Sequence, residues 1–532
     1  MCRNVGVPAL AGLLLVLAGC EPKVVDYQVR VVTSACVAPS PLEGVTHLRF
    51  RVTGPGLEQP LIAVSKIEEA VQRVPEIPAG PKRVLEVRGY GGDPATSAVV
   101  SLGTSQPFDV PDVVPEGAAP VEIVVFLRRV NTFTPPSTIQ APTTCSRLTS
   151  ARAGHSATLL DDGRVLLAGG YQFGAERARD TLHTAELYDP ATGSFSNAQD
   201  VGLFNSQAQF TAIPRAFHGA VKLPDGQVLL AGGERRSGGS YFANKTALVY
   251  TPGVNRFWGF EMKAGRIGAG LAVDEGGRVL VVGGVDSQGK AVASPEWFDP
   301  KRGAFIAQNP DDPAQSAKEN PKLLPAAAPR IGMSVSPVQD GRYIAVAGGS
   351  DGAQLSDEIL FYKFDGSTFA PEPSTVRLRQ TRQGAGLARF GDSSRLVIVG
   401  GYGGMTAPAG ALSSSELIST GTAFNVADGQ PVTASRGDVC VVSLPDGRVL
   451  AVGGRAGDAN APVSVKNAEL LAPSPSGGAA VFEVPQLPVG RYHHSCTTLQ
   501  DGSVLVIGGV EEAASGPRVL SDAWIFTPAP LD

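Results

Sequence analysis

After residue 150, an apolar strand that ends in a pair of glycines recurs seven times. Successive pairs are 51 to 65 residues apart, and an arginine stands 17 or 18 residues before each pair. A repeat of this length, built from short strands, is typical of a β-propeller and not of a helical solenoid. The first glycines of the pairs are Gly169, Gly232, Gly283, Gly348, Gly400, Gly453 and Gly508.

The residues before each glycine pair form the pattern of a β-hairpin. In the first copy, residues 152–160 and 164–170 are joined by the dipeptide Asp162-Gly163. Asp-Gly in such a place favours a type I′ turn, in which glycine adopts a positive φ without steric cost. The same dipeptide begins at Asp225, Asp340, Asp446 and Asp501 in four other copies.

A third and a fourth strand follow in the same copy. Residues 185–190 read Ala-Glu-Leu-Tyr-Asp-Pro, and Thr192-Gly193 and Phe195 come next. This order is similar to the kelch motif, and the resemblance covers residues 149–532, although the fifth and sixth copies lack the tyrosine and the aspartate. The resemblance implies an all-β fold: a seven-bladed propeller with four strands per blade, like that of the kelch and galactose oxidase superfamily.

The last copy is incomplete, which bears on how the ring closes. It stops at Phe526-Thr527-Pro528 without a fourth strand. The kelch resemblance implies a blade assembled from both ends of the propeller. We therefore expect residues 131–148, which precede the first copy, to supply the outer strand of the last blade.

Residues 24–130 precede the repeats and alternate apolar with polar residues. The alternation is clear at residues 25–31, 48–52 and 121–127. A period of two indicates strands with one buried face. The segment resembles the Ig-like or transthyretin-like spacer domains of surface lipoproteins, which implies a small β-sandwich that acts as a stalk; a second binding module is the alternative.

The N-terminus has the pattern of an export signal. Arg3 precedes an apolar run that is too short to span a bilayer, and the run ends in Leu17-Ala18-Gly19-Cys20. These four residues resemble the lipobox of bacterial lipoproteins, which implies cleavage after residue 19, acyl chains such as palmitate on Cys20 and a tether over residues 20–23. Glu21 favours the outer membrane of the cell envelope by the same resemblance, and an ordinary secretory signal is the alternative.

Charge and composition restrict the partners. The chain has 45 Lys and Arg against 50 Asp and Glu, so its net charge of −5 gives no basic field that would attract nucleic acid. We expect a monomer whose ligand is an envelope protein or a polysaccharide.

Four cysteines lie outside the signal and the anchor, and export permits disulfides. Cys36 begins the stalk and Cys145 lies just before the first blade, so a bridge between them would pin the two domains together. Cys440 and Cys496 lie four and five residues after their arginines, on opposite strand faces of neighbouring blades. We interpret the second pair as buried thiols.

The seven arginines occupy one repeat position and therefore form a ring near one end of the central channel. Such a ring could hold an anionic ligand through forked hydrogen bonds. We favour a structural role, because a binding site rarely needs seven identical groups. The arginines are Arg152, Arg215, Arg266, Arg330, Arg382, Arg436 and Arg491.

The loops after the glycine pairs differ in length and chemistry, whereas the strands on either side of them repeat. Loops on a rigid scaffold are where binding residues concentrate, and arginine and tyrosine are favoured there. We expect the binding face to include Arg177, Arg179, Arg235, Arg236, Tyr241, Tyr402 and Arg455.

Motifs of catalysis are scarce. His155, His218 and His494 share one repeat position and are predicted to be structural, which leaves His47, His183 and His493. We therefore expect no catalytic residue, metal or other cofactor, and predict a membrane-anchored lipoprotein whose propeller is a non-catalytic scaffold that binds protein or glycan. The alternative is a galactose oxidase-like copper oxidoreductase, with copper held by two histidines and two tyrosines, one crosslinked to cysteine, or another carbohydrate-active enzyme on this fold.

Overall fold

The computed structural model describes residues 27–531 except 37, 70–73, 113–120, 175–178, 238–239, 308–329, 367, 373, 422, 459 and 475–476. The predicted signal peptide and Cys20 lie outside this range. The described chain is all-β, and its one short helical element is the 3-10 turn η2 (Pro252–Val254). No helix among the described residues is long and apolar enough to cross a membrane.

The N-terminal domain is a seven-stranded sheet in the order β1-β7-β5-β4-β2-β3, with β6 also paired to β4. Its core contains Phe50, Val52, Leu85, Val87 and Val125. The strands form one hydrogen-bonded sheet, and the division into a sandwich of two sheets stays a prediction. The strands are β1 (Tyr27–Thr33), β2 (His47–Thr53), β3 (Leu61–Lys66), β4 (Gly80–Tyr90), β5 (Val99–Thr104), β6 (Phe108–Val110) and β7 (Val121–Arg129).

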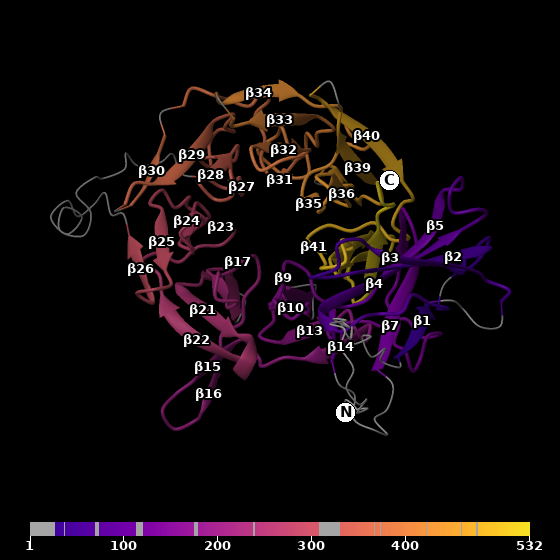
Figure 1. Cartoon of the computed structure of the whole chain (residues 1–532). Coiled ribbons are helices and arrows are strands. Elements are labelled where there is room, and N and C mark those ends of the chain that lie inside the picture. The colour runs from indigo at the N-terminus through magenta and orange to yellow at the C-terminus, as the bar shows by residue number, and fades with distance from the viewer. Residues whose placement is uncertain are drawn as a thin grey trace, which may run out of the picture.

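Seven four-stranded antiparallel sheets form a closed ring, which confirms the predicted seven-bladed propeller (Figure 1). The first three blades are β9 (Ser156–Leu159), β10 (Val165–Ala168), β13 (Ala185–Asp189) and β14 (Ser194–Asn197); β17 (Gly219–Lys222), β18 (Val228–Ala231), β21 (Thr246–Thr251) and β22 (Arg256–Glu261); and β23 (Gly270–Val273), β24 (Val279–Val282), β25 (Glu296–Asp299) and β26 (Ala304–Ala307).

Blades 4 to 6 have the same four-stranded plan. Their strands are β27 (Ser334–Val338), β28 (Tyr343–Ala347), β29 (Ile359–Phe364) and β30 (Phe369–Pro371); β31 (Gly386–Arg389), β32 (Arg395–Val399), β33 (Ser415–Ser419) and β34 (Asn425–Asp428); and β35 (Cys440–Ser443), β36 (Val449–Val452), β39 (Ala468–Pro473) and β40 (Ala479–Val484).

Blade 7 joins both ends of the propeller. It contains β41 (Ser495–Thr498), β42 (Val504–Ile507) and β45 (Ala523–Thr527), and its outer strand is β8 (Thr132–Thr134). β8 pairs with β45, and the rings of Phe133 and Phe526 lie 5.2 Å apart. The outer edge of blade 7 is therefore covered by residues that precede blade 1 in the sequence.

The blades pack face to face because the second strand of each is apolar on both faces. In β10, Leu166 and Ala168 belong to the core shared with blade 2, whereas Val165 and Leu167 belong to the core shared with blade 7. This is why the strands before the glycine pairs are continuously apolar instead of alternating.

Two disulfides are present. Cys36 and Cys145 are bridged, with their Cα atoms 5.4 Å apart. Cys440 and Cys496 are also bridged, at 6.1 Å, so the prediction of buried thiols is wrong. Adjacent blades meet through opposite faces of their sheets, and the opposite orientation of the two cysteines therefore brings them together. The disulfides indicate an oxidising, non-cytoplasmic compartment.

Candidate active site at the propeller mouth

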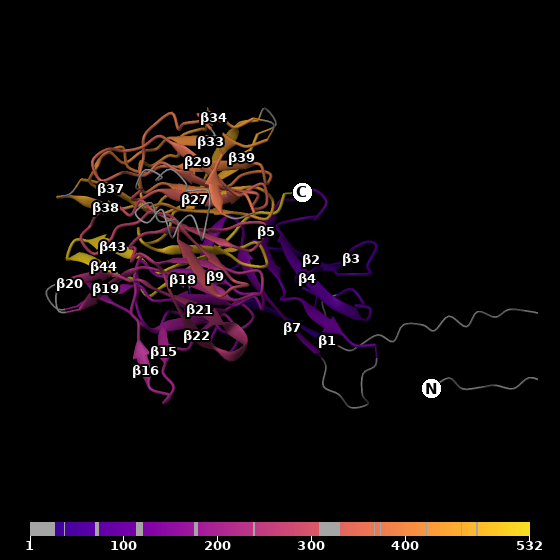
Figure 2. The same ribbon diagram turned by 90° about the vertical axis from the view of Figure 1, so that its left-hand side faces the viewer.

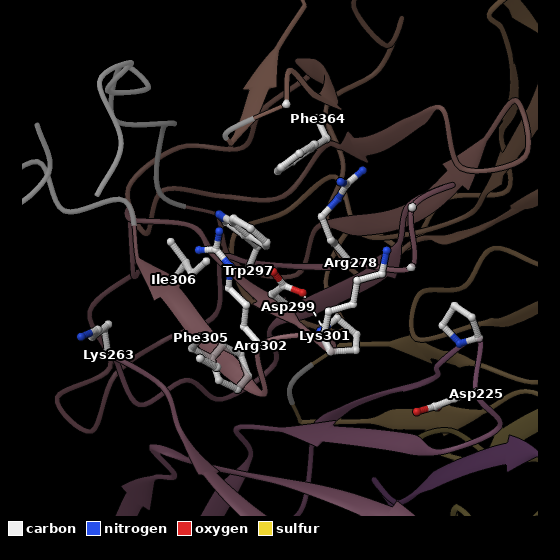
Figure 3. Close-up of a pocket in the computed structure, with 16 residues that line it drawn as sticks. Asp225, Lys263, Arg278, Trp297, Asp299, Lys301, Arg302, Phe305, Ile306 and Phe364 are labelled. Atoms are coloured by element: carbon white, nitrogen blue, oxygen red, sulfur yellow. Dashed lines mark hydrogen bonds and ion pairs between the residues drawn. The ribbon is translucent and has the colours of Figure 1, made fainter. Parts of the chain in front are cut away.

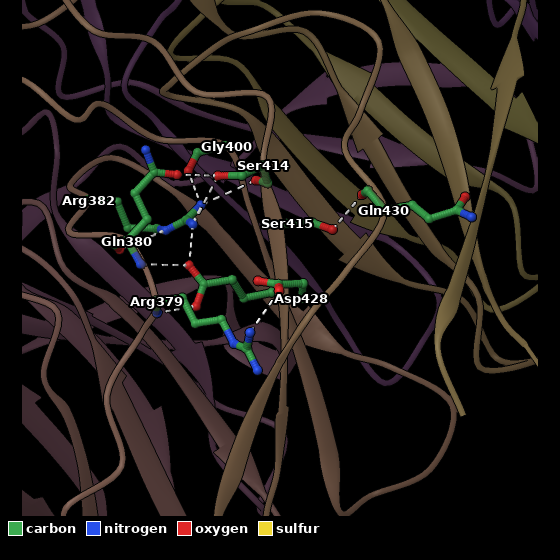
Figure 4. A network of polar contacts seen from close by, with 9 residues as sticks. Arg379, Gln380, Arg382, Gly400, Ser414, Ser415, Asp428 and Gln430 are labelled. Carbon is green, nitrogen blue, oxygen red and sulfur yellow. Dashed lines mark hydrogen bonds and ion pairs between the residues drawn. The ribbon is translucent and has the colours of Figure 1, made fainter. Parts of the chain in front are cut away.

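Each of the seven arginines is buried, at 2% exposure or less. In six copies the guanidinium donates to the carbonyl of the first glycine of the pair or to the backbone just before the third strand, and it pairs with an acid. Figure 4 shows Arg382, which donates to Gly400 O at 2.7 Å and also contacts Glu416. The acids are Glu186, Glu296, Glu358, Glu416, Glu469 and Asp522.

Arg215 departs from this pattern, because Ala247 takes the place of the acid in blade 2. Its Nη1 donates to Gly232 O and Thr246 O, both at 3.2 Å, and burial lowers its pKa to about 9. All seven guanidinium groups thus hold the frame of their own blade and present no open ring to a ligand.

The position two residues after each arginine has a different role. In every copy its backbone is left-handed, with φ between 49° and 69°. Four copies have glycine there, as this conformation favours, but three have side chains that cost strain energy. The seven residues are Gly154, Phe217, Gly268, Gly332, Gly384, Asp438 and His493.

These seven residues surround the propeller axis. Main-chain hydrogen bonds of 2.8–2.9 Å link five of the seven successive pairs, as from Phe217 N to Gly154 O and from Gly154 N to His493 O. In these copies the left-handed backbone turns the amide toward the preceding blade. The three side chains that replace glycine therefore meet at the mouth of the channel.

His493 is the centre of this cluster. Its Nδ1 lies 3.0 Å from the Tyr171 hydroxyl, and its Nε2 lies 3.8 Å from Asp438 Oδ2. Its ring also packs edge-on against Phe217, at a centroid distance of 4.9 Å. The Tyr402 hydroxyl donates to Asp438 at 2.9 Å, so one chain of polar contacts runs from blade 1 to blade 5.

Burial controls the protonation of these groups. A fifth of the His493 side chain is exposed, but the surrounding protein still lowers its pKa to about 4, so the imidazole is neutral at pH 7. Burial raises the pKa of Tyr171 to about 12. Burial and the neighbouring Asp438 carboxylate raise the pKa of Tyr402, which therefore stays a phenol and a hydrogen-bond donor.

Four hairpins stand on the same face and form a wall around part of the mouth. Figure 2 shows three of them on the side away from the N-terminal sheet. Neighbouring hairpins are joined, as from Arg236 N to Thr181 Oγ1 and from Glu512 N to Ser464 Oγ, each at 3.1 Å. The hairpins are β11–β12 (Tyr171–Phe173, Arg179–Thr181), β19–β20 (Glu234–Ser237, Ser240–Ala243), β37–β38 (Arg455–Gly457, Pro462–Ser464) and β43–β44 (Val510–Ala513, Gly516–Val519).

The wall places two of the predicted binding residues beside the cluster. The Arg179 guanidinium lies 5.0 Å from the centre of the Tyr171 ring, and Arg455 lies 4.8 Å from that of Tyr492. Arg455 also lies 3.4 Å from Glu512, which accepts a hydrogen bond from the Tyr492 hydroxyl at 2.7 Å.

The other predicted binding residues have different positions. Arg235 and Arg236 stack on Phe242 and Tyr241 along β19–β20. Tyr402 is buried beneath Asp438, and Arg177 lies outside the described residues. Phe217 and Asp438 were not among the predicted site residues, and His493 was considered only for the copper alternative, although a break in the glycine pattern two residues after the arginines marks all three.

The remaining histidines do not join the cluster. His155 and His218 bond to Ser495 and Ser156 of the preceding blades, at 2.9 and 2.8 Å. His183 is about half exposed and lies 3.7 Å from Asp200, and His47 contacts Thr46 in the N-terminal sheet.

The described residues do not provide the donor set of a galactose oxidase-like copper site. That set needs two histidines and a tyrosine crosslinked to cysteine, whereas His493 is the one imidazole in the chain of contacts described above. Every described cysteine is in a disulfide. No group of three or more His, Cys, Asp or Glu side chains within the described part of the chain could hold a metal ion.

Comparison with solved structures shows which propellers this chain resembles. It is similar to a structure described as a novel fungal alcohol oxidase of the AA5 family, in complex with copper, with a TM-score of 0.52 and 16% identity over 75% of this chain and 77% of that chain. A second structure, of YjhT, matches with a TM-score of 0.41 and 12% identity over 72% of this chain and 96% of that chain. No family model and no curated protein sequence matches the chain.

The first likeness establishes a galactose oxidase-like propeller fold. It contradicts the prediction of a non-catalytic binding scaffold and agrees better with the alternative, an enzyme on the same fold.

Proposed function

We propose that the protein is a carbohydrate-active enzyme that uses acid–base chemistry at the propeller mouth. The observation that carries the proposal is the placement of Asp438 and His493 in left-handed backbone at positions where four other copies have glycine. Strain of this kind persists where the surrounding structure enforces it, and it concentrates at active sites.

The two side chains are suited to proton transfer with a hydroxyl group. Asp438 Oδ2 and His493 Nε2 are 3.8 Å apart, and each side chain is partly exposed. A sugar hydroxyl seated between them donates its proton toward the carboxylate and accepts a hydrogen bond from an imidazole N–H. Tyr171 and Tyr402 act as positioning residues, because the Tyr171 hydroxyl bonds to the imidazole and the Tyr402 hydroxyl donates to the carboxylate.

The surroundings favour a polar, ring-shaped substrate. Arg179 and Arg455 reach the mouth from the hairpin wall, and the rings of Phe217 and Tyr492 flank His493. Arginine and aromatic side chains together bind hydroxylated or carboxylated rings through hydrogen bonds and stacking. We assign no step to copper, because the donor set does not fit.

Two kinds of variant test the proposal. Replacing Asp438 by Asn or His493 by Gln should lower kcat/KM on a responsive sugar by about 10²–10⁴, the usual loss when a general acid or base is removed. Products from a panel of neutral and acidic sugars would be followed by proton NMR. Unchanged turnover in both variants would refute the proposed site.

The glycine variant of Asp438 separates chemistry from folding. Asp438→Gly restores the residue that the left-handed backbone prefers, so the variant should be at least as stable as the parent and still inactive. Loss of activity together with loss of folding would instead indicate a structural role for Asp438.

We also propose that the chain is exported and lipid-anchored through Cys20, with the outer membrane favoured by Glu21, and that the N-terminal domain acts as the stalk. The mouth faces away from the N-terminal sheet (Figure 2), so a stalk arrangement would leave the mouth open to solvent. Metabolic labelling with palmitate, which Cys20→Ala should abolish, tests the anchor.

A further inference from the structure

A trough on the outer rim of blades 2 to 4 forms a second site, separate from the mouth. Three cavities of about 1000, 350 and 420 Å³ follow one another there. The first two share Lys263, Ala304 and Phe305, and the last two share Phe260 and Glu261. Common walls make them one extended surface.

Aromatic rings line the trough along its length. Trp258 is 46% exposed on β22, at the end where the extra hairpin β15–β16 (Gly202–Phe204, Phe210–Ala212) projects (Figure 1). Phe260 and Phe305 follow in the middle, and Trp297 and Phe364 line the large cavity (Figure 3).

The trough is cationic although the chain as a whole has a net charge of −5. Six basic side chains line it against three acidic ones, Asp225, Glu261 and Asp299. The basic side chains are Lys245, Arg256, Lys263, Arg278, Lys301 and Arg302.

Half of these basic groups are available to a ligand. Lys245, Arg278 and Arg302 pair with nearby acids. Lys263, Lys301 and Arg256 have no ion pair with any described residue, and Arg256 instead lies between the rings of Phe204 and Trp258, at 5.2 and 4.8 Å.

One buried donor points to a ligand independently of the charges. Trp297 is 4% exposed and lines the large cavity, and its indole N–H has no hydrogen-bond partner among the described residues. Buried indole N–H groups usually find a partner. A hydroxyl or carboxylate oxygen in the cavity would supply the missing acceptor.

We propose that this trough binds an acidic oligosaccharide, independently of the chemistry at the mouth. A sugar ring stacks on the exposed Trp258, and carboxylates along the chain pair with Lys263, Lys301 and Arg256. The alternation of rings and cations over three blades suits an extended chain of charged rings better than a single small anion.

Isothermal titration of the exported chain with a hexameric oligogalacturonate tests the proposal, with cellohexaose as the neutral probe of equal length. Trp258→Ala and Lys263→Glu should each weaken binding of the acidic hexamer about tenfold, and 0.5 M salt should remove most of it, because exposed ion pairs are screened. Phe482→Ala and Lys466→Glu likewise remove an aromatic ring and reverse a charge, at exposed positions outside the trough, and should leave binding unchanged.

The outcomes are separable. The proposal would be overturned if cellohexaose bound as tightly as the acidic hexamer, or if the two control variants lost as much affinity as the trough variants. It would also be overturned if poly-glutamate or anionic vesicles bound as tightly as the acidic hexamer. Because no mouth residue is altered, loss of activity in the Asp438 variants does not affect this test.

Discussion

The buried pair of Arg382 and Glu416 offers a quantitative test of what holds a blade together. Both side chains are almost fully buried, and Glu416 also accepts hydrogen bonds from the main-chain N–H groups of Arg379 and Gln380, at 2.7 and 3.3 Å (Figure 4). Glu416→Gln keeps the shape but leaves the guanidinium without a counter-charge. Removing one partner of such a pair costs about 3–5 kcal/mol.

The same blade supplies a matched control. Arg379 and Asp428 form an ion pair of 2.7 Å, but their side chains are 55% and 70% exposed. Exposed pairs contribute about 0–1 kcal/mol, because water and salt screen the charges. Asp428→Asn removes one carboxylate charge, as Glu416→Gln does, and should therefore have little effect.

Thermal unfolding followed by circular dichroism measures both variants. With an unfolding entropy of about 2.1 cal/mol/K per residue, each kcal/mol of lost stability lowers the Tm of the propeller, residues 149–532 taken as one cooperative unit, by roughly 1.2 °C. Glu416→Gln should therefore lower Tm by about 4–6 °C and Asp428→Asn by about 1 °C or less. A Tm within 1 °C of the parent for Glu416→Gln, or equal losses in the two variants, would refute the reasoning.

Three other predictions follow from the same contacts. Burial lowers the pKa of His493 to about 4, from 6.5 in the unfolded chain, so the unfolded state takes up the proton first as the pH falls. The free energy of unfolding should therefore drop by about 3 kcal/mol through His493 between pH 6.5 and pH 4. Urea denaturation at several pH values should show a smaller drop for His493→Gln. The Cys440–Cys496 disulfide closes a separation of 56 residues, and replacing both cysteines by serine should cost up to about 4 kcal/mol in urea denaturation. A chain that begins at residue 150 lacks β8 and should melt below one that begins at residue 131; equal melting temperatures would show that β8 contributes nothing to blade 7.

The repeat made the propeller predictable from sequence. Seven copies in register specify the number of blades, and the Asp-Gly turns and apolar strands specify the hairpins, because these are local features of chain geometry. The disulfide of Cys440 and Cys496 was not predictable in the same way. Strand faces can be read from alternation, but only the packing of blade 6 against blade 7 makes opposite faces meet.

The candidate active site was likewise predictable from the sequence only in part. The loops after the glycine pairs could be located from sequence, and Arg179 and Arg455 on them do reach the mouth. The importance of Asp438 and His493 arises from contacts around the propeller axis between residues more than fifty positions apart. The break in the glycine pattern marks these positions in the sequence, but only the folded propeller brings their side chains into contact.

The sequence by itself determined the architecture and the position of the arginines, because repetition and turn chemistry act over a few residues. The tertiary structure decided which groups the arginines bond to, which cysteines are bridged and how three side chains converge at the mouth. Those features depend on closing the ring of blades, which brings distant segments into contact, and contact across the ring has no signature within any one repeat.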